Sequence, residues 1–264
     1  MYSFDYQRPT SRAEAGAAFQ GDARYLAGGQ SLVQAMRLRL ASSERLVDLG
    51  GIADLKGIRV DADGVHVGAM TTHATVARSP EVRGAIPALA ELAEGIGDPM
   101  VRNVGTLGGS VANADPAADY PAALLALGAT VQTDRRAIPA EQFFTGLYET
   151  ALEPGELVTA VSFPVPEKAA YMKLRQPASR FALVGVFVAR TGAGVRVAVT
   201  GAKGYVFRAK ALEDALAANF APEAARAVQL PAADFNGDLH ASPEYRAAMV
   251  CVMAARAVEA ALSR

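Results

Sequence analysis

The sequence predicts an α+β fold in two domains, on three observations. The chain has 264 residues, and a typical domain has roughly 100 to 200 residues, so two domains are favoured. Hydrophobic residues make up 51% and charged residues 20%, which is enough apolar material for a core. Short β-rich runs alternate with helical segments at first, whereas three consecutive β-runs followed by helices come later. This change falls near 164–170, so we expect one domain over 1–168 and another over 169–264.

The first elements follow from capping and turn signals. Ser11 and Glu14 have the spacing of a capping box, which predicts the start of a helix. A short strand at 25–27, a glycine pair and an amphipathic helix from about residue 31 or 32 to Leu40 come next. Farther on, Asp63–Gly64 between two β-rich runs predicts a hairpin.

The remaining elements are predicted from apolar patterns and their boundaries. Helices are expected over 85–96 and from Tyr120 to a stop at Gly128, with strands at 129–134 and 156–163. Three β-runs then cover 171–202. Helices follow over 209–220, 222–229 and 242–262, and Ser242 caps the last of them with Pro243 at its first position.

Charge and hydropathy exclude several classes of function. The net charge is −1, from 26 basic and 27 acidic residues, so no field attracts nucleic acid or anionic lipid. No N-terminal basic segment precedes an apolar core, so we expect no signal peptide. The apolar run 181–189 is far shorter than the roughly 20 residues of a membrane helix. We expect the protein to be located in the cytoplasm and to have no membrane span.

The few cysteines and histidines argue against a metal centre in this chain. A single cysteine, Cys251, forms no internal disulfide and is too few for a zinc or iron–sulfur site; in its apolar helical segment it is expected to be a buried hydrophobe. The three histidines have no paired-ligand spacing. His73 is expected to be a polar residue on a helix rather than a base. We therefore predict no metal ligand and no catalytic residue in this chain.

Two segments share a glycine pair followed by a hydroxyl residue, AGGQS at 27–31 and TLGGS at 106–110. Glycine allows successive N–H groups to turn toward one point and leaves no Cβ in the way of a phosphate. The first pair also leads into a helix N-terminus, which favours an anion. Neither the P-loop spacing nor GxGxxG occurs. Two converging bends would hold a diphosphate, whereas singly each pair is simply a tight turn.

Four ordered motifs relate the chain to a known family: LAGGQSL, VRNVGTLGGSVANADPAADYPAALLALGA, GELVTAV and YMKLRQPASRFALVGV. Through them the chain resembles, over nearly its whole length, the FAD-binding medium subunit of molybdenum hydroxylases, the family of carbon monoxide dehydrogenase and xanthine dehydrogenase. The resemblance implies an oxidoreductase flavoprotein. Its fold would be a two-part FAD-binding domain of the vanillyl-alcohol-oxidase (PCMH) type, followed by a smaller C-terminal domain with a three-stranded sheet and helices.

The resemblance also implies the residues that bind FAD. Asp119 has the position of a carboxylate that contacts FAD, Lys173 that of a lysine at the flavin, and Val158 that of an aliphatic flavin contact. Ile96 stands where some relatives have an aromatic neighbour of the flavin. From the residues alone, Asp119 would equally cap the following helix, Lys173 would lie on a solvated face, and Val158 in the core. The two diphosphate loops match Leu26, Ala27, Gly28, Gly29, Gln30, Ser31 and Leu32, and Thr106, Leu107, Gly108, Gly109 and Ser110.

The implied function is electron transfer within a heterotrimer. In such relatives a large subunit oxidises the substrate at a molybdenum cofactor, and two 2Fe–2S clusters on a small subunit pass electrons to FAD, which delivers them to an external acceptor. The assembly is expected to be a dimer of heterotrimers. A single cysteine agrees, because the clusters must lie on another polypeptide. Two alternatives remain open: a self-sufficient flavin oxidase of a small substrate, and a module that keeps the fold without the cofactor.

Overall fold

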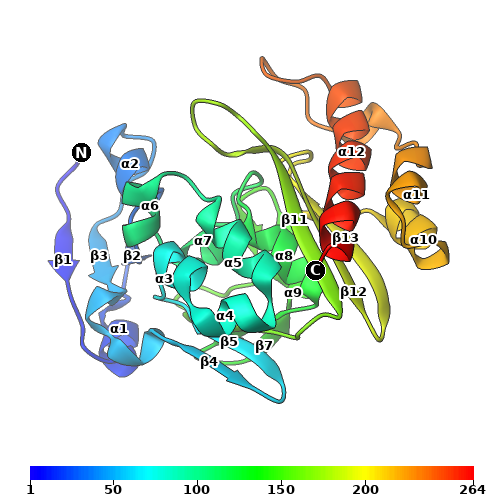
Figure 1. The fold of residues 1–264 in the computed structure, drawn as a ribbon. Helices are drawn as coiled ribbons and strands as arrows, with labels where there is room; N and C mark the ends of the chain where they lie inside the picture. The colour runs from blue at the N-terminus through cyan, green and yellow to red at the C-terminus, as the bar shows by residue number, and fades with distance from the viewer.

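The computed structural model describes residues 1–264, which form three larger sheets, one two-stranded ribbon and the helices that pack against them. Figure 1 shows a small N-terminal sheet at one end, a helix-rich middle section, and a third sheet that packs against the long helix α12 at the other end. No helix of the structure is both long enough and apolar enough to cross a membrane.

The N-terminal sheet is parallel, with the order β1-β3-β2. Ser11 accepts a hydrogen bond from the Glu14 N–H, so α1 begins as predicted. Helix α2 ends at Arg37, before the predicted Leu40, because Arg39 adopts a left-handed φ of 58° and turns the chain away. The elements are β1 (Asp5–Gln7), α1 (Arg12–Ala18), β2 (Ala23–Leu26), α2 (Leu32–Arg37), β3 (Arg45–Asp48) and the 3-10 turns Leu49–Gly51 and Ala53–Leu55.

The central sheet has five strands in the order β4-β5-β10-β6-β7, all antiparallel. The Asp63–Gly64 hairpin is confirmed, with Gly64 at a φ of +130°. The predicted helix 85–96 is shorter, because Pro87 starts a separate helix after Ile86. The strands are β4 (Ile58–Asp61), β5 (Gly64–Gly68), β6 (Thr130–Thr133), β7 (Ala137–Pro139) and β10 (Val158–Phe163), and a ribbon is formed by β8 (Phe144–Gly146) and β9 (Glu149–Thr150).

Seven helices belong to this middle section. Gly128 ends α8 in a left-handed conformation, as predicted. The helices are α3 (His73–Arg78), α4 (Pro80–Ala85), α5 (Pro87–Glu94), α6 (Pro99–Val104), α7 (Leu107–Asn113), α8 (Tyr120–Leu127) and α9 (Ala140–Phe143).

The third sheet has the order β11-β12-β13-β14. Three long strands match the predicted β-runs, and a two-residue fourth strand is added that is too short to leave a sequence pattern. Ser242 caps α12 and Pro243 occupies its first turn, as predicted. The elements are β11 (Lys168–Arg175), β12 (Ala182–Thr191), β13 (Gly194–Thr200), β14 (Phe207–Arg208), α10 (Lys210–Ala218), α11 (Pro222–Ala227), a 3-10 turn Ala232–Asp234 and α12 (Pro243–Leu262).

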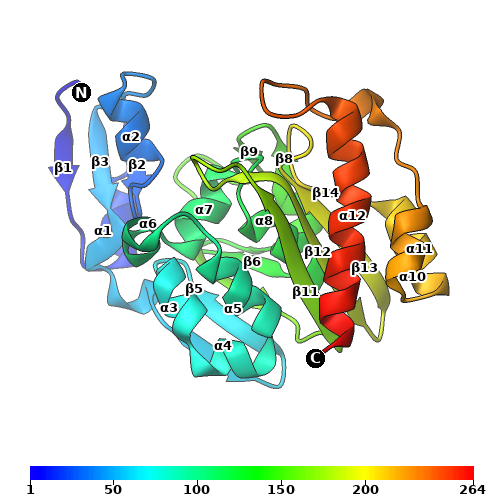
Figure 2. The same ribbon diagram turned by 45° about the horizontal axis from the view of Figure 1, so that its top comes forward.

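Both faces of the third sheet are buried, because successive residues of a strand point to opposite faces. In β12, Phe187 and Ala189 belong to the core that contains α8, whereas Val186 and Val188 belong to the core that contains α12. All eight residues of α8 are buried. Figure 2 shows α12 lying along this sheet, and α8 packs against β12 and β13 from the other side. Helix α8 therefore joins the central and C-terminal parts through one core.

Candidate functional site

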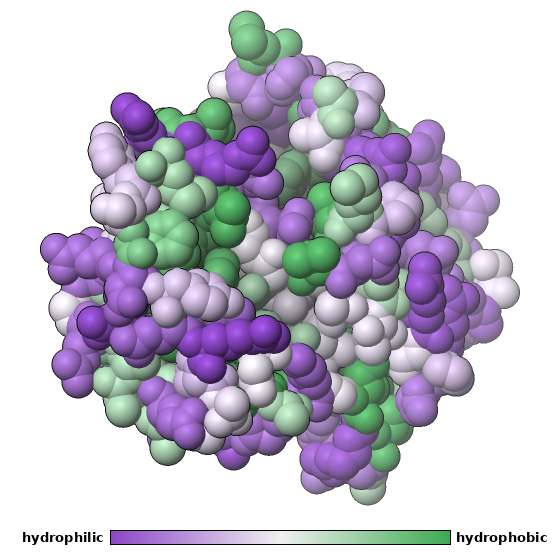
Figure 3. All heavy atoms as spheres, turned by 90° about the vertical axis from the view of Figure 1, so that its left-hand side faces the viewer, coloured by the Kyte–Doolittle hydropathy of each residue, from purple (hydrophilic) through white to green (hydrophobic).

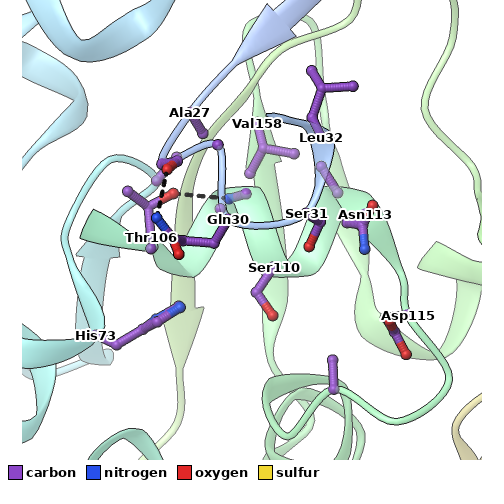
Figure 4. A pocket seen from close by; sticks show the side chains of 18 of the residues that line it. Ala27, Gln30, Ser31, Leu32, His73, Thr106, Ser110, Asn113, Asp115 and Val158 are labelled. Atoms are coloured by element: carbon purple, nitrogen blue, oxygen red, sulfur yellow. Dashed lines mark hydrogen bonds between the residues drawn. The ribbon is translucent and has the colours of Figure 1, made fainter. Parts of the chain in front are cut away.

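A cavity of about 420 Å³ lies where the N-terminal sheet, the middle helices and the β11–β12 loop meet. Its volume falls within the range of small-molecule sites. It is lined by the turn after β2, the start of α7, the segment at Ile96 and Gly97, and the loop residues Ser179 to Phe181. Figure 3 views the molecule from the side of the N-terminal sheet, and this face is hollowed near its middle. Figure 4 shows the cavity from close by.

The two glycine-containing segments lie side by side, as predicted. A Cβ added to Gly109 would lie 3.0 Å from the Cβ of Ala27, and a Cβ on Gly28 would lie 2.2 Å from the carbonyl oxygen of Val104. Real Cβ atoms do not approach other atoms so closely, so Gly28 is required where these two backbones meet. Both segments line the same cavity.

The AGGQS turn offers free backbone donors. The N–H groups of Gly28, Gly29, Gln30 and Ser31 donate to no acceptor in the protein. Gly29 has a φ of +68°, the left-handed conformation that lets neighbouring amides face one side. Arg24, which lies on β2 just before the turn, also lines the cavity and adds a positive charge. Unpaired amides beside a cation favour an anionic group.

The TLGGS segment differs from the predicted tight bend, because it is the first turn of α7. Thr106 caps the helix, and its Oγ1 accepts from the Gly109 N–H. The N–H groups of Leu107 and Gly108 donate to the carbonyl oxygens of Thr71 and Ala69. These amides already have partners, so the glycines here serve close packing rather than a ring of free donors. Figure 4 shows the side chains of Thr106 and Ser110 at the cavity.

Asp119 lies at the cavity wall within a buried charge cluster. Lys173 Nζ lies 2.8 Å from Asp119 Oδ2, and the hydroxyl of Tyr171 donates to the other carboxylate oxygen. Burial raises the pKa of Asp119, and the ammonium of Lys173 opposes that rise. The capping interpretation of Asp119 is wrong, because its side chain makes no bond to the start of α8. Lys173 is 5% exposed, so the solvated-face interpretation is also wrong.

All but two of the predicted site residues line the cavity. Leu107 is fully buried behind the start of α7, and Lys173 reaches the cavity only through Asp119. Val158 is 5% exposed and belongs to the core, as its local interpretation predicted. It also lines the cavity, and its contact with a flavin stays a prediction. Ile96 also lines the cavity, and Arg102 braces it by donating to the Ile96 carbonyl.

Several lining residues carry no signal in the sequence. His73 is on a helix, α3, as predicted, and it is also buried, 5% exposed, at the cavity. Arg180, in the β11–β12 loop, has a φ of 62° and donates to Gly97 on the opposite wall. Glu156 is held by Arg136, whose guanidinium lowers the pKa of this carboxyl to about 2. Their placement depends on tertiary contacts, which periodicity does not report.

With this geometry established, comparison with known proteins defines the class. Residues 2–166 match the model of the family described as FAD binding domain in molybdopterin dehydrogenase. The chain belongs to this family of oxidoreductase FAD-binding domains.

Named relatives extend the match beyond that domain. The chain is 39% identical to the carbon monoxide dehydrogenase medium chain of Afipia carboxidovorans, over 99% of this chain and 98% of the relative. It is 36% identical to the nicotine 6-hydroxylase medium subunit of Paenarthrobacter nicotinovorans, covering 92% of this chain and 91% of the relative. The solved structure of reconstituted CO dehydrogenase from Oligotropha carboxidovorans superposes with a TM-score of 0.89 at 36% identity, covering 100% and 99%.

The residues of the cavity fit an FAD. A diphosphate is an anion with several acceptor oxygens, and the free amides from Gly28 to Ser31 are donors without acceptors. The close approach of Gly28 to Val104 leaves the turn without a side chain on that side. The aliphatic wall at Ile96 and Val158 suits the flat apolar face of a flavin.

Proposed function

We propose that this chain is the FAD-binding electron-transfer subunit of a heterotrimeric molybdenum hydroxylase. Electrons would come from 2Fe–2S clusters of a small partner subunit and leave to an external acceptor, while a large molybdenum subunit oxidises the substrate. A bound FAD carries the redox step on its ring, so the protein supplies binding, orientation and electrostatics.

The observation that supports the proposal most is the run of unpaired amides beside the cavity. Gly28, Gly29, Gln30 and Ser31 would bind the diphosphate through N–H donors, with Arg24 contributing charge. The start of α7 would add the hydroxyls of Thr106 and Ser110. The carbon monoxide dehydrogenase and nicotine 6-hydroxylase relatives, named as medium chains, support the place of this chain in a larger assembly.

Asp119 and Lys173 would act at the flavin end of the cavity as one unit. Asp119 faces the cavity, and Lys173 holds the carboxylate from behind at 2.8 Å. Since the two charges largely cancel, the pair would position a hydrogen-bond acceptor without a strong net field. Val158 would contact the flavin from the wall of the cavity.

The proposed layout has an FAD-binding domain of the PCMH type over 1–168 and a flavoprotein C-terminal domain over 169–264. The N-terminal and central sheets would form the two parts of the first domain, and the cavity lies where they meet. The third sheet with α10 to α12 would form the second domain. We also propose that this chain and its two partner subunits assemble in the cytoplasm as a dimer of heterotrimers.

The experiment that tests the function has two arms. FAD and FMN are titrated into the purified full chain and followed by absorbance; we expect FAD to bind at least about 100-fold more tightly, because FMN lacks the diphosphate. The tagged chain is also isolated from its own cells, and we expect one molybdenum and about four iron atoms per FAD, from two 2Fe–2S clusters. A protein that binds no FAD in either preparation would overturn the proposal.

The rival function is a self-sufficient flavin oxidase, which needs a base beside the flavin. His73 is the histidine at the cavity, and burial lowers its pKa to about 4, so it is a weak base. The rival predicts that the isolated FAD-loaded chain reduces its flavin with a small substrate. We expect no reduction by the isolated chain.

A further inference from the structure

His73 is a buried polar residue that the proposed diphosphate contacts leave unused. Its side chain lines the cavity and is 5% exposed. Thr72 caps α3, and the His73 N–H donates to Gly105 at 3.0 Å, so the backbone beneath the ring is fixed. Figure 4 shows the ring extending toward the cavity below Ser110. The imidazole is therefore built into the wall of the site.

One ring nitrogen of His73 is sealed in the protein without a partner. Nδ1 is fully buried and makes no hydrogen bond, and the same holds for the hydroxyl of Tyr120. The two rings are neighbours, with centroids 5.4 Å apart. Buried polar atoms without partners are unfavourable, and a single buried water can satisfy two of them. A water that accepts from the Tyr120 hydroxyl and donates to Nδ1 would satisfy both groups.

The other ring nitrogen lies against the cavity wall. A Cβ at Gly105 would come within 2.7 Å of His73 Nε2, so the ring occupies its place only because residue 105 is glycine. Gly105 itself lines the cavity. No side chain or backbone group of the protein forms a hydrogen bond with Nε2, which leaves it available to a bound ligand.

The surroundings keep the ring neutral. Burial, with a smaller contribution from the positive charge of Arg102 on α6, lowers the pKa of His73 to about 4. From α8 the ring meets Tyr120, with the buried Asp119 next in sequence. A neutral imidazole has one proton, and if Nδ1 is an acceptor that proton is on Nε2.

We propose that His73 is a further FAD-contacting residue, which donates a hydrogen bond from Nε2–H to an oxygen of the bound flavin nucleotide. Tyr120 acts as its positioning residue, because a water that accepts from the Tyr120 hydroxyl and donates to Nδ1 would place the ring proton on Nε2. This inference rests on the proposed FAD site and assigns it a neutral donor besides the main-chain amides. The acceptor is an oxygen of either the diphosphate or the flavin ring, and the experiment separates the two.

The test is nitrogen NMR of the imidazoles in the full chain labelled with nitrogen-15. The chain has only three histidines, so His73→Gln assigns the signal directly. We expect the proton on Nε2 and no titration between about pH 5.5 and 8. FAD should shift the Nε2 resonance. If ADP produces the same shift, the acceptor is a diphosphate oxygen; if only FAD and FMN do so, it is a ring oxygen.

Two variants measure the energetic effect. His73→Leu removes the donor and should weaken FAD binding about tenfold, whereas His73→Gln retains an N–H group and should stay within about threefold of the native chain. Tyr120→Phe should keep the fold but let the proton appear on both nitrogens in the NMR spectrum. A ring that titrates near neutral pH, a proton on Nδ1, or an Nε2 signal unmoved by FAD would overturn the inference. FAD binding itself is followed by absorbance, so failure of the proposed function is recognised separately.

Discussion

The close approach of the AGGQS turn to the end of α6 makes Gly28→Ala a sensitive perturbation. The new Cβ would lie 2.2 Å from the Val104 carbonyl oxygen and 2.7 Å from the Gly105 Cα. Ordinary contacts begin at about 3.5 Å, so the two backbones must separate by about 1 Å. Overpacking costs about 1 to 3 kcal/mol, and we expect about 3 because both sides of this contact are main chain. The turn would also move away from α7, which should weaken FAD binding at least about tenfold.

Urea unfolding and FAD titration measure the two effects on the same preparation. Gly16→Ala is the matched control, since Gly16 lies inside α1 and an added Cβ would meet nothing within 4 Å. That control should gain about 0.5 to 1 kcal/mol from helix propensity and leave FAD binding unchanged. Native stability together with native FAD affinity in Gly28→Ala would refute the reasoning, because the contact would then be dispensable.

Three further predictions concern buried charge and the thiol. Glu156→Gln should lower the free energy of unfolding by about 2 kcal/mol, a figure reduced from about 3 because Arg136 is partly exposed. The pKa of Glu156 in the folded chain is lowered to about 2, so its contribution to stability is full above about pH 4.5 and is lost as the pH falls toward 2. An unchanged acid unfolding transition in the variant would contradict this. Lys173→Met should lower the free energy of unfolding by about 3 kcal/mol, because Asp119 is left buried without a cation. Adding Asp119→Asn should restore at least half of that loss, measured by urea unfolding. If the losses of the two substitutions simply add, the pair is not coupled. Burial raises the pKa of Cys251, so a thiol reagent should label it only after denaturant is added, and rapid labelling of the native chain would show that α12 opens.

Local signals predicted the parts of the site that depend on local backbone. The glycine pair at 28–29 produces a turn at the predicted place because Gly29 needs a positive φ. The Asp63–Gly64 hairpin and the Ser242 cap also follow from neighbours in sequence. The resemblance to the FAD-binding family supplied Asp119 and Lys173, which no periodicity would have selected.

The wrong predictions, for TLGGS and for the capping role of Asp119, concern residues whose structure is decided by contacts with residues distant in sequence. TLGGS is a helix start because Thr71 and Ala69, far away in sequence, accept the amide protons that a free turn would leave open. Asp119 does not cap α8, since Lys173 and Tyr171 from β11 take its carboxylate oxygens. The helical position of His73 was predicted correctly, but its burial, with Gly105 against one edge of the ring, was not visible in the sequence. Each outcome is a tertiary contact that a single sequence does not display.

The fully buried helix α8 has a consequence for how the chain can be divided. A fragment that stopped before β11 would present this helix, with its run of alanine and leucine side chains, to water on the side that β12 and β13 normally cover. Such a fragment should aggregate or recruit chaperones rather than bind nucleotide. We therefore expect the central part of the chain to reach its stable fold only after β12 and β13 have been synthesised.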